Sequence, residues 1–444
     1  MPGGIWTSQN KVLPGVYIRF KTGTALGLTV GDRGVVTICE PMSWGPVAQV
    51  TPVTLTTDVT PITGYDITAP QNRFLQEMFK GTNRTSAPTT ILLYRPTASG
   101  SAQAKVTTGE LTATAVYPGA RGNDISVVIT ELTDPESTFT VSTVVDGAIV
   151  DQQTAAQISE LVANAWVTFS GTGALAATTG AALTGGADGT VQSAAYSAYL
   201  TAIEPYKFDI MVYDGSDSTV QTALLSFIER VNENNGQYCQ LVASGLSNPD
   251  SRYVININSP VTLSDGTELT PQQVTWWAGG ASAGALYNQS LTYAQYPGAV
   301  STTMQTVDQF TQAVQAGNFV LFAENGVVKV MQDINSLTTY TEDIGQVYSK
   351  NRVMRLCNTI ANDIFQQFSE SFIGVVNNNE QGRARFQAAI VGYLQEIQDN
   401  QGIQNFTSDD VEVLAGSAID AIVVNVAIQA VDSVEKVYLS LEIS

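Results

Sequence analysis

The chain has 444 residues, of which 44% are hydrophobic and only 14% are charged. Its net charge of −20 argues against direct binding to nucleic acid, because the phosphate backbone is itself anionic. The sequence contains no histidine, which excludes a Ser-His-Asp or Cys-His nucleophile and removes the commonest general base and transition-metal ligand.

The N-terminal region combines a loose tether with one short strand. Residues 1–15 are rich in Gly, Pro and polar residues and show no period, whereas Val16, Ile18 and Phe20 then alternate onto one face. This strand, which also contains Tyr17, has two interpretations. It is either an edge strand of its own domain or a strand that is donated to a neighbouring subunit.

A small acidic β domain is expected next. Residues 106–190 contain nine acidic residues against a single basic one, Arg121. The strand patterns in this stretch are Ile125–Thr130, Phe139–Val145, Ala148–Val150 and Trp166–Phe169. Asp146-Gly147 predicts a tight hairpin turn. Gly/Ala/Ser/Thr-rich tracts on both sides predict flexible connectors, and an insertion of this kind implies that its two ends lie close together.

From about residue 191 the pattern becomes α/β. Phe208–Tyr213 and Gln240–Ala243 are predicted strands, and between them a helix capped by Ser218 predicts a parallel β-α-β unit. Thr270-Pro271 opens another helix that runs through the glycine-rich stretch 279–284. This stretch lacks the lysine of a phosphate loop, so it predicts close helix packing. Further along, Asn325-Gly326 predicts the turn of a β-hairpin.

The last hundred residues predict two helices followed by terminal strands. The helices span about Gln346–Ile373 and Gln381–Asp399. Arg383 and Arg385 stand near the start of the second helix, where they oppose its dipole, so we expect them to reach a carboxylate or a neighbouring subunit. The chain then ends in two strand patterns that predict a hairpin. The last places four apolar residues on one face, and these are Val437, Leu439, Leu441 and Ile443.

These patterns predict a mixed α+β and α/β multidomain fold. It has an α/β core with C-terminal helices and terminal β-strands, and an inserted small antiparallel β domain. Five parts are expected: an N-terminal arm with an exchanged strand (1–22), the first part of the core (23–104), the inserted outer domain (105–190), the α/β core (191–345) and a C-terminal helical domain with a terminal hairpin or arm (346–444).

No motif predicts a catalytic residue, a cofactor or a metal. The cysteines Cys39, Cys239 and Cys357 lie far apart without a metal-binding spacing, which fits a reducing compartment. Neither a signal sequence nor a run of about 18 apolar residues is present, so we expect a product that stays in the cytosol until assembly, without membrane insertion. An acidic hydrolase that uses Asp/Glu pairs remains a distant alternative.

Several segments, in order and spacing, resemble contractile tail sheath proteins of myophages and of the phage-like elements and bacteriocins of Gram-positive bacteria. The similarity spans nearly the whole chain. The segments are Asn10–Tyr17, Tyr117–Asp124, Ala278–Gly280, Asn288–Tyr293, Asn335–Thr341, Lys350–Arg355, Ile373–Asn378 and Gly382-Arg383.

The resemblance implies a structural, non-enzymatic subunit that stacks in hexameric rings as a helical array around a tail tube. Its further partners would be baseplate and tail terminator proteins. It implies assembly in the bacterial host cytoplasm, and contraction that drives the tube through the target cell envelope for genome ejection. Strand exchange would use Val16, Tyr17, Ile18, Phe20, Val437, Leu439, Leu441 and Ile443, with Arg383 and Arg385 as possible inter-subunit contacts. A phage-like bacteriocin or another contractile injection system is the alternative to an infectious phage.

Overall fold

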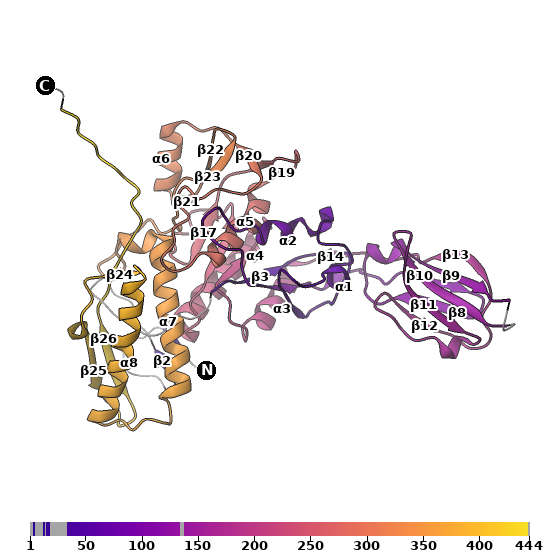
Figure 1. Ribbon diagram of the computed structural model, residues 1–444, viewed down its shortest axis with the longest axis horizontal. Coiled ribbons are helices and arrows are strands. Elements are labelled where there is room, and N and C mark those ends of the chain that lie inside the picture. The colour runs from indigo at the N-terminus through magenta and orange to yellow at the C-terminus, as the bar shows by residue number, and fades with distance from the viewer. Residues whose placement is uncertain (1–2, 5–11, 14, 18–32, 134–136, 443–444) are drawn as a thin grey trace. The chain divides into compact units, whose positions relative to one another are not determined.

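The computed structural model describes residues 3–4, 12–13, 15–17, 33–133 and 137–442 (Figure 1). This part of the chain divides into two compact units. The first contains the described residues up to Thr37, then Glu77–Ile91 and the chain from Tyr206 onward; the second contains Ile38–Gln76 and Leu92–Pro205. Both units mix helices and strands, which confirms the predicted multidomain fold class.

A parallel sheet forms the centre of the first unit. The parallel strands are β15 (Ile210–Val212), β16 (Gln240–Ser244), β17 (Val254–Ile257) and β21 (Asn318–Phe319). The hydrogen-bonded order β21-β17-β16-β15 continues into β3 (Val35–Cys39), whose first residues belong to this unit. Strand β5 (Thr90–Tyr94) ends in the second unit, where β4 (Val50–Val53) is its neighbour.

The predicted β-α-β unit is present, with a corrected helix start. Helix α4 (Ser218–Arg230) connects β15 to β16. Asp217, rather than Ser218, caps it, because the Asp217 side chain accepts a hydrogen bond of 2.8 Å from the Thr219 amide. A turn of π-helix at Val231–Asn235 follows, and Gly236 ends it in the left-handed conformation.

Helix α5 (Pro271–Gly284) approaches its neighbours closely because its glycines have no Cβ atom. Thr270 caps it in a reciprocal arrangement with Gln273. A Cβ atom on Gly280 would lie 2.0 Å from the carbonyl oxygen of Met78, and one on Gly284 would lie 2.1 Å from that of Ser86. Close helix packing, as predicted, therefore accounts for this stretch.

Shorter elements complete the first unit. These are β1 (Gly3–Gly4), β2 (Val16–Tyr17), β18 (Val261–Leu263), β19 (Glu268–Leu269), β20 (Ala299–Thr302), α6 (Val307–Gln315), β22 (Leu321–Glu324) and β23 (Val327–Val330). Helix α2 (Arg73–Met78) ends in this unit. Strands β22 and β23 form the predicted hairpin, with Asn325 and Gly326 both at positive φ in its turn.

Two long helices and two small sheets form the C-terminal part of this unit. The helices are α7 (Asn351–Ser371) and α8 (Glu380–Asp399), and the strands are β24 (Ile403–Gln404), β25 (Val411–Ala415), β26 (Ile422–Val426) and β27 (Gln429–Ala430). Leu356 and Ile360 of α7 share a buried core with Phe386, Ile390 and Leu394 of α8. Figure 1 shows the two orange helices side by side, with β25 and β26 next to α8.

The predicted terminal hairpin is wrong in its pairing. Strand β26 is present where the alternation from Ile422 to Ile428 predicts the first of the two strands, but it pairs antiparallel with β25 and not with residues 437–442. Residues 431–442 form no strand within the described chain. The segment that became β25, which the sequence analysis overlooked, places Val411 and Val413 in the same core as Val424 and Val426 of β26.

The second unit contains an antiparallel β-sandwich. Its strands are β7 (Lys105–Thr108), β8 (Leu111–Ala115), β9 (Ile125–Glu131), β10 (Phe139–Val145), β11 (Ala148–Ala155), β12 (Val167–Ser170) and β13 (Thr178–Ala182). They form one sheet in the order β11-β10-β9-β13 and another in the order β12-β8-β7. The predicted turn at Asp146-Gly147 joins β10 to β11, with both residues at positive φ. Helices α1 (Thr60–Thr63) and α3 (Ser193–Ile203) complete the unit.

The two connectors of the sandwich are paired with each other, which corrects the prediction of flexible tracts. Strand β6 (Ala98–Ser99) pairs antiparallel with β14 (Thr190–Val191), and further bridges join Ala102 to Ala187 and Lys105 to Thr184. We call these paired connectors the stem. Backbone hydrogen bonds hold the stem although its side chains are small, and they bring the two ends of the sandwich together as expected.

Arg121 ties the sandwich to the rest of the second unit. Its guanidinium donates two hydrogen bonds of 2.8 and 2.6 Å to the Asp146 carboxylate and one of 2.8 Å to the carbonyl oxygen of Gly64. Trp44, which is fully buried, packs against Trp166 of the sandwich, with 4.9 Å between ring centroids. The single basic residue of this acidic stretch is therefore structural.

Candidate assembly site

The C-terminal end of the chain leaves the fold after a short stretch of pairing. Strand β27 pairs antiparallel with β24, and the amide of Val431 then donates a hydrogen bond of 3.0 Å to the carbonyl oxygen of Gly402. We call residues 432–444 the C-terminal arm; the structure describes it as far as residue 442. In Figure 1 this yellow segment runs out alone, away from the helices and strands of its unit.

Glu435 holds the start of the arm against the first unit. Its carboxylate accepts hydrogen bonds from Thr292 Oγ1 at 2.8 Å and from Gln332 Nε2 at 2.6 Å, and Lys350 Nζ also donates to it. Only 12% of the side chain is exposed. Burial by itself would raise the pKa of Glu435, but the hydrogen bonds from Lys350, Gln332 and Thr292 outweigh burial and lower it, so the carboxylate is ionised at neutral pH.

A second carboxylate, Asp333, lies at the centre of a buried network. It accepts hydrogen bonds from Arg355 at 2.5 Å, from the Leu291 amide at 2.9 Å and from Asn351 Nδ2 at 3.0 Å. Arg355 also donates to the carbonyl oxygen of Gln289 at 2.8 Å. Asp333 is 2% exposed and Arg355 is fully buried. This pair therefore fixes loops from several elements around the start of α7.

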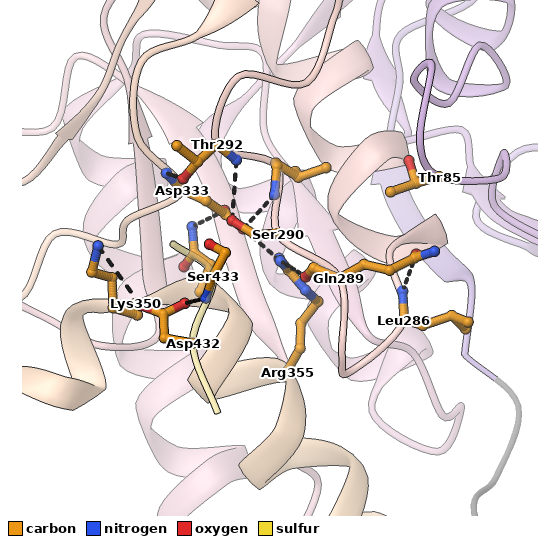
Figure 2. A network of polar contacts seen from close by, with 12 residues as sticks. Thr85, Leu286, Gln289, Ser290, Thr292, Asp333, Lys350, Arg355, Asp432 and Ser433 are labelled. Carbon is orange, nitrogen blue, oxygen red and sulfur yellow. Dashed lines mark hydrogen bonds and ion pairs between the residues drawn. The ribbon is translucent and has the colours of Figure 1, made fainter. Parts of the chain in front are cut away.

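The two networks meet at Thr292 and Lys350. Thr292 Oγ1, which donates to Glu435, accepts a hydrogen bond of 3.0 Å from the Asp333 amide. Lys350 Nζ, which also contacts Glu435, lies 3.9 Å from the carboxylate of Asp432. Figure 2 shows Lys350 and Asp432 facing each other, with Asp333 and Thr292 close by. The groups that bind the arm are thus held in place by the buried pair.

Beyond Glu435 the arm exposes apolar side chains to solvent. Val437, Leu439 and Leu441, which share one face of an extended chain, are 83%, 77% and 80% exposed. Within the described part of the arm, residues 436–442 make no hydrogen bond or ion pair with the rest of the chain. An exposed apolar row of this kind is typical of a surface that another molecule covers.

The small sheet of β25 and β26 offers edges to which a strand could add. It contains two strands in the described chain, so the outer edge of each lacks a ladder partner there. The sheet is nevertheless well supported, because Val411 is buried and Val413 and Val424 pack into the core beneath α8. Unpaired edge groups on a firmly packed strand can accept a further strand through main-chain hydrogen bonds.

Metal-binding clusters, exposed thiols and membrane-spanning helices are also absent from the described residues. No group of three or more His, Cys, Asp or Glu suited to a metal ion occurs among the described residues. The three cysteines are buried, and burial raises the pKa of the Cys357 thiol to about 12. None of the described helices combines the length and apolarity that a membrane crossing requires.

One cavity of about 110 Å³ is lined in part by Asp188. The Asp188 carboxylate accepts hydrogen bonds from the Ser43 hydroxyl and the Ala120 amide, so it already has structural partners.

Comparison with known proteins decides the family. Three phage tail sheath family models match the chain: the beta-sandwich domain at residues 98–188, the central domain at 189–336 and the C-terminal domain at 343–444. The phage-like element PBSX protein XkdK of Bacillus subtilis (strain 168) is 32% identical over the full length of both chains. The chain belongs to the phage tail sheath protein family.

Solved structures agree with this assignment. A sheath tail protein from Desulfitobacterium hafniense superposes with a TM-score of 0.85 at 39% identity, covering 96% of this chain and 99% of that one. A sheath complex of an extracellular contractile injection system, in its contracted state, shares the fold with a TM-score of 0.54 at 12% identity over 98% of both chains. The protein is a structural subunit of the tail sheath of a phage or a contractile injection system.

The residues predicted for strand exchange are described in part. In this sheath subunit, Val437, Leu439 and Leu441 lie on the exposed arm. Val16 and Tyr17 form β2, which pairs in parallel with Gly3-Gly4. Ile18, Phe20 and Ile443 lie outside the described residues. Their exchange with other subunits stays a prediction.

Arg383 and Arg385 lie in the first turns of α8. Arg383 donates a hydrogen bond of 3.1 Å to Asn378 Oδ1, and Arg385 is exposed. Neither forms an ion pair with a carboxylate among the described residues of the sheath subunit. Contact with a neighbouring subunit stays a prediction.

The contacts of Glu435 were not predicted, although the sequence contains a signal for them. Glu435 falls on the same alternating phase as Val437, Leu439 and Leu441. A charged residue on an otherwise apolar face is informative, since it needs a partner when that face is covered. Lys350 is one of the partners that Glu435 meets.

Proposed function

We propose that the subunit is linked to its neighbours by its terminal segments, in hexameric rings that stack as a helical array around a tail tube. The role is mechanical, with no catalytic residue. Contraction of the array drives the tube through the target cell envelope, and the particle is assembled in the cytoplasm of the host bacterium. The tail tube, baseplate and tail terminator proteins are the further partners.

One observation carries this proposal: the apolar face of the C-terminal arm has no cover within the described chain. Val437, Leu439 and Leu441 are each at least 77% exposed. Burying each of them would contribute about 1.5–3 kcal/mol, while ordering the backbone costs about 1–2 kcal/mol for each residue. These contributions nearly cancel, so one arm binds weakly and an array with every arm engaged is held by many contacts together.

The edges of the β25–β26 sheet are the proposed receiving surface. An arm from one subunit would extend this sheet in another, and the N-terminal strand that begins at Val16 would do the same. The helical layer of α7 and α8, near residues 350–415, is the proposed side that faces the tube.

The two faces of the arm provide a direct test. Replacing Val437, Leu439 and Leu441 together by serine should leave a folded monomer that forms no sheath on a tail tube, because the donated face is lost. The matched control replaces Tyr438, Ser440 and Glu442, on the opposite face, by Ser, Ala and Gln, and should still assemble. Circular dichroism checks folding, and electron micrographs count sheaths. Normal sheath from the first variant would overturn the arm mechanism.

Micrographs of the natural particles address the class of particle. A sheath that surrounds a tube attached to a capsid would belong to a phage. A sheath that is found only on particles without a capsid would support the alternative, a phage-like bacteriocin or another contractile injection system.

A further inference from the structure

We propose that Glu435 is a positioning residue, which sets the point where the C-terminal arm leaves the subunit and whose release lengthens the free arm. This inference rests on the proposed function, in which the arm reaches another subunit. It assigns a role to the one charged side chain that the described arm turns inward.

The alternation of burial along the arm supports this role. Val431, Ser433 and Glu435 are half-buried, whereas the residues between them, Asp432 and Val434, are exposed. The segment therefore lies in an extended conformation against the first unit with every second side chain inward. From Lys436 onward every described residue is exposed. The attachment of the arm thus ends at Glu435.

The contacts of Glu435 fix the location of its carboxylate more than they increase the strength with which the arm is bound. Glu435 meets three donors, Thr292, Gln332 and Lys350, which come from separate segments of the chain. Hydrogen bonds from several directions fix a carboxylate more narrowly than apolar contact does. Removing an ion pair from water costs much of what the attraction provides, so such a contact defines a location while remaining able to open.

The position of Glu435 fixes how far the arm can reach. If Glu435 detaches, the next firm attachment is the backbone hydrogen bond of Val431. Four residues, 432–435, then join the free arm, and an extended chain covers at most about 3.3–3.6 Å for each residue. Detachment of Glu435 therefore lengthens the free arm by about 14 Å without breaking any strand pairing. This added length allows neighbouring subunits to move apart while the arm still joins them.

Lys436 allows the attachment to be measured in the monomer. Trypsin cleaves after lysine and must bind several extended residues on both sides of the bond, including those that Glu435 holds in place. The Glu435→Gln variant should therefore release the peptide 437–444 about tenfold faster than the natural protein, measured by mass spectrometry. The matched control is Glu442→Gln, which removes the same charge from an exposed residue of the arm and should shift the rate less than twofold.

A second variant tests the same contact from the other side. Lys350→Met removes the cation and leaves Glu435 in the sequence, and it should also accelerate release of the peptide. If Glu435→Gln and Glu442→Gln release the peptide at equal rates, Glu435 does not hold the arm. That result would overturn the inference whatever the assembly experiments show.

Assembly on a tail tube then separates this inference from the proposed function. Glu435→Gln keeps the apolar face of the arm, so we expect sheaths to form, but with at least a twofold fall in their mean length because the arm starts from a variable point. Sheaths identical to those of the natural protein would contradict the positioning role alone. Deletion of residues 437–444 should abolish sheaths, and normal sheaths from that deletion would contradict the proposed function instead.

Discussion

In the buried ion pair of Asp333 and Arg355, the two side chains differ in how many other hydrogen-bond partners they have. Asp333 keeps two further donors, the Leu291 amide and Asn351, when Arg355 is removed. Arg355 would keep a single acceptor in the described chain, the carbonyl oxygen of Gln289, when Asp333 is removed. Its Nε and Nη1 atoms are already buried without an acceptor among the described residues. The guanidinium therefore depends more on the carboxylate than the carboxylate depends on the guanidinium.

This asymmetry predicts an order of stability between two variants. Asp333→Ala should lower the free energy of unfolding by about 3–5 kcal/mol, because it leaves a buried cation unpaired. Arg355→Met should cost less, since the remaining carboxylate keeps two donors. Urea unfolding followed by circular dichroism measures both, and Glu324→Gln, which breaks the exposed pair with Lys329, should change stability by less than about 1 kcal/mol. The reverse order of the first two variants would contradict this account.

Among the elements, helix α5 depends most visibly on the absence of side chains. Gly280 and Gly284 lie against the backbone carbonyl groups of Met78 and Ser86, which cannot rotate aside as a flexible side chain would. Helix α8 provides a contrast, because Gly392 has open space around the position of a Cβ atom. Glycine thus serves close packing at Gly280 of α5 and has no packing role at Gly392 of α8.

Alanine substitutions in these two helices should have effects of opposite sign. Gly280→Ala should destabilise the protein by at least about 3 kcal/mol or prevent folding, since the helix would have to move away from the Met78 carbonyl. Gly392→Ala should stabilise it by about 0.5–1 kcal/mol through helix propensity. Thermal unfolding of both variants checks the prediction, and a neutral Gly280→Ala would show that the approach of α5 is not tight.

Elements with strong local signals could be predicted from the sequence, and those set by distant contacts could not. Apolar periodicity placed α7 and α8, and turn residues such as Asn325-Gly326 placed the β22–β23 hairpin. Strand β25 was missed because five residues with one glutamate between valines give a weak pattern until β26 pairs with them. The stem was misjudged because its strength lies in backbone hydrogen bonds, which composition does not reveal.

For the whole molecule, the order of segments along the chain was enough to predict the sheath family. The contacts that secure its parts were not predictable in the same way. The ion pair of Arg121 joins residues 25 positions apart, and Glu435 binds a lysine 85 positions away. Charges at such separations have no periodic signature, so their partners become visible only when the fold brings them together.

The β-sandwich and the rest of the second unit share a core through Trp44. Deleting residues 100–188 and closing β6 to β14 with an Asn-Gly turn should therefore expose Trp44 and cause aggregation, because this fully buried ring packs on Trp166. Adding Trp44→Ser to the deletion should restore a soluble, folded protein. Size-exclusion chromatography compares the two deletions, and equal solubility would show that Trp44 is not what the sandwich protects.

The stem has a practical consequence beyond the mechanics of the particle. Because β6 and β14 are hydrogen-bonded neighbours, the two ends of the sandwich emerge about 4.8 Å apart. In a subunit that also carries Trp44→Ser, another folded protein whose own termini lie that near each other could replace the sandwich without stretching the host fold. Each subunit of an assembled particle would then carry one grafted protein at a defined position.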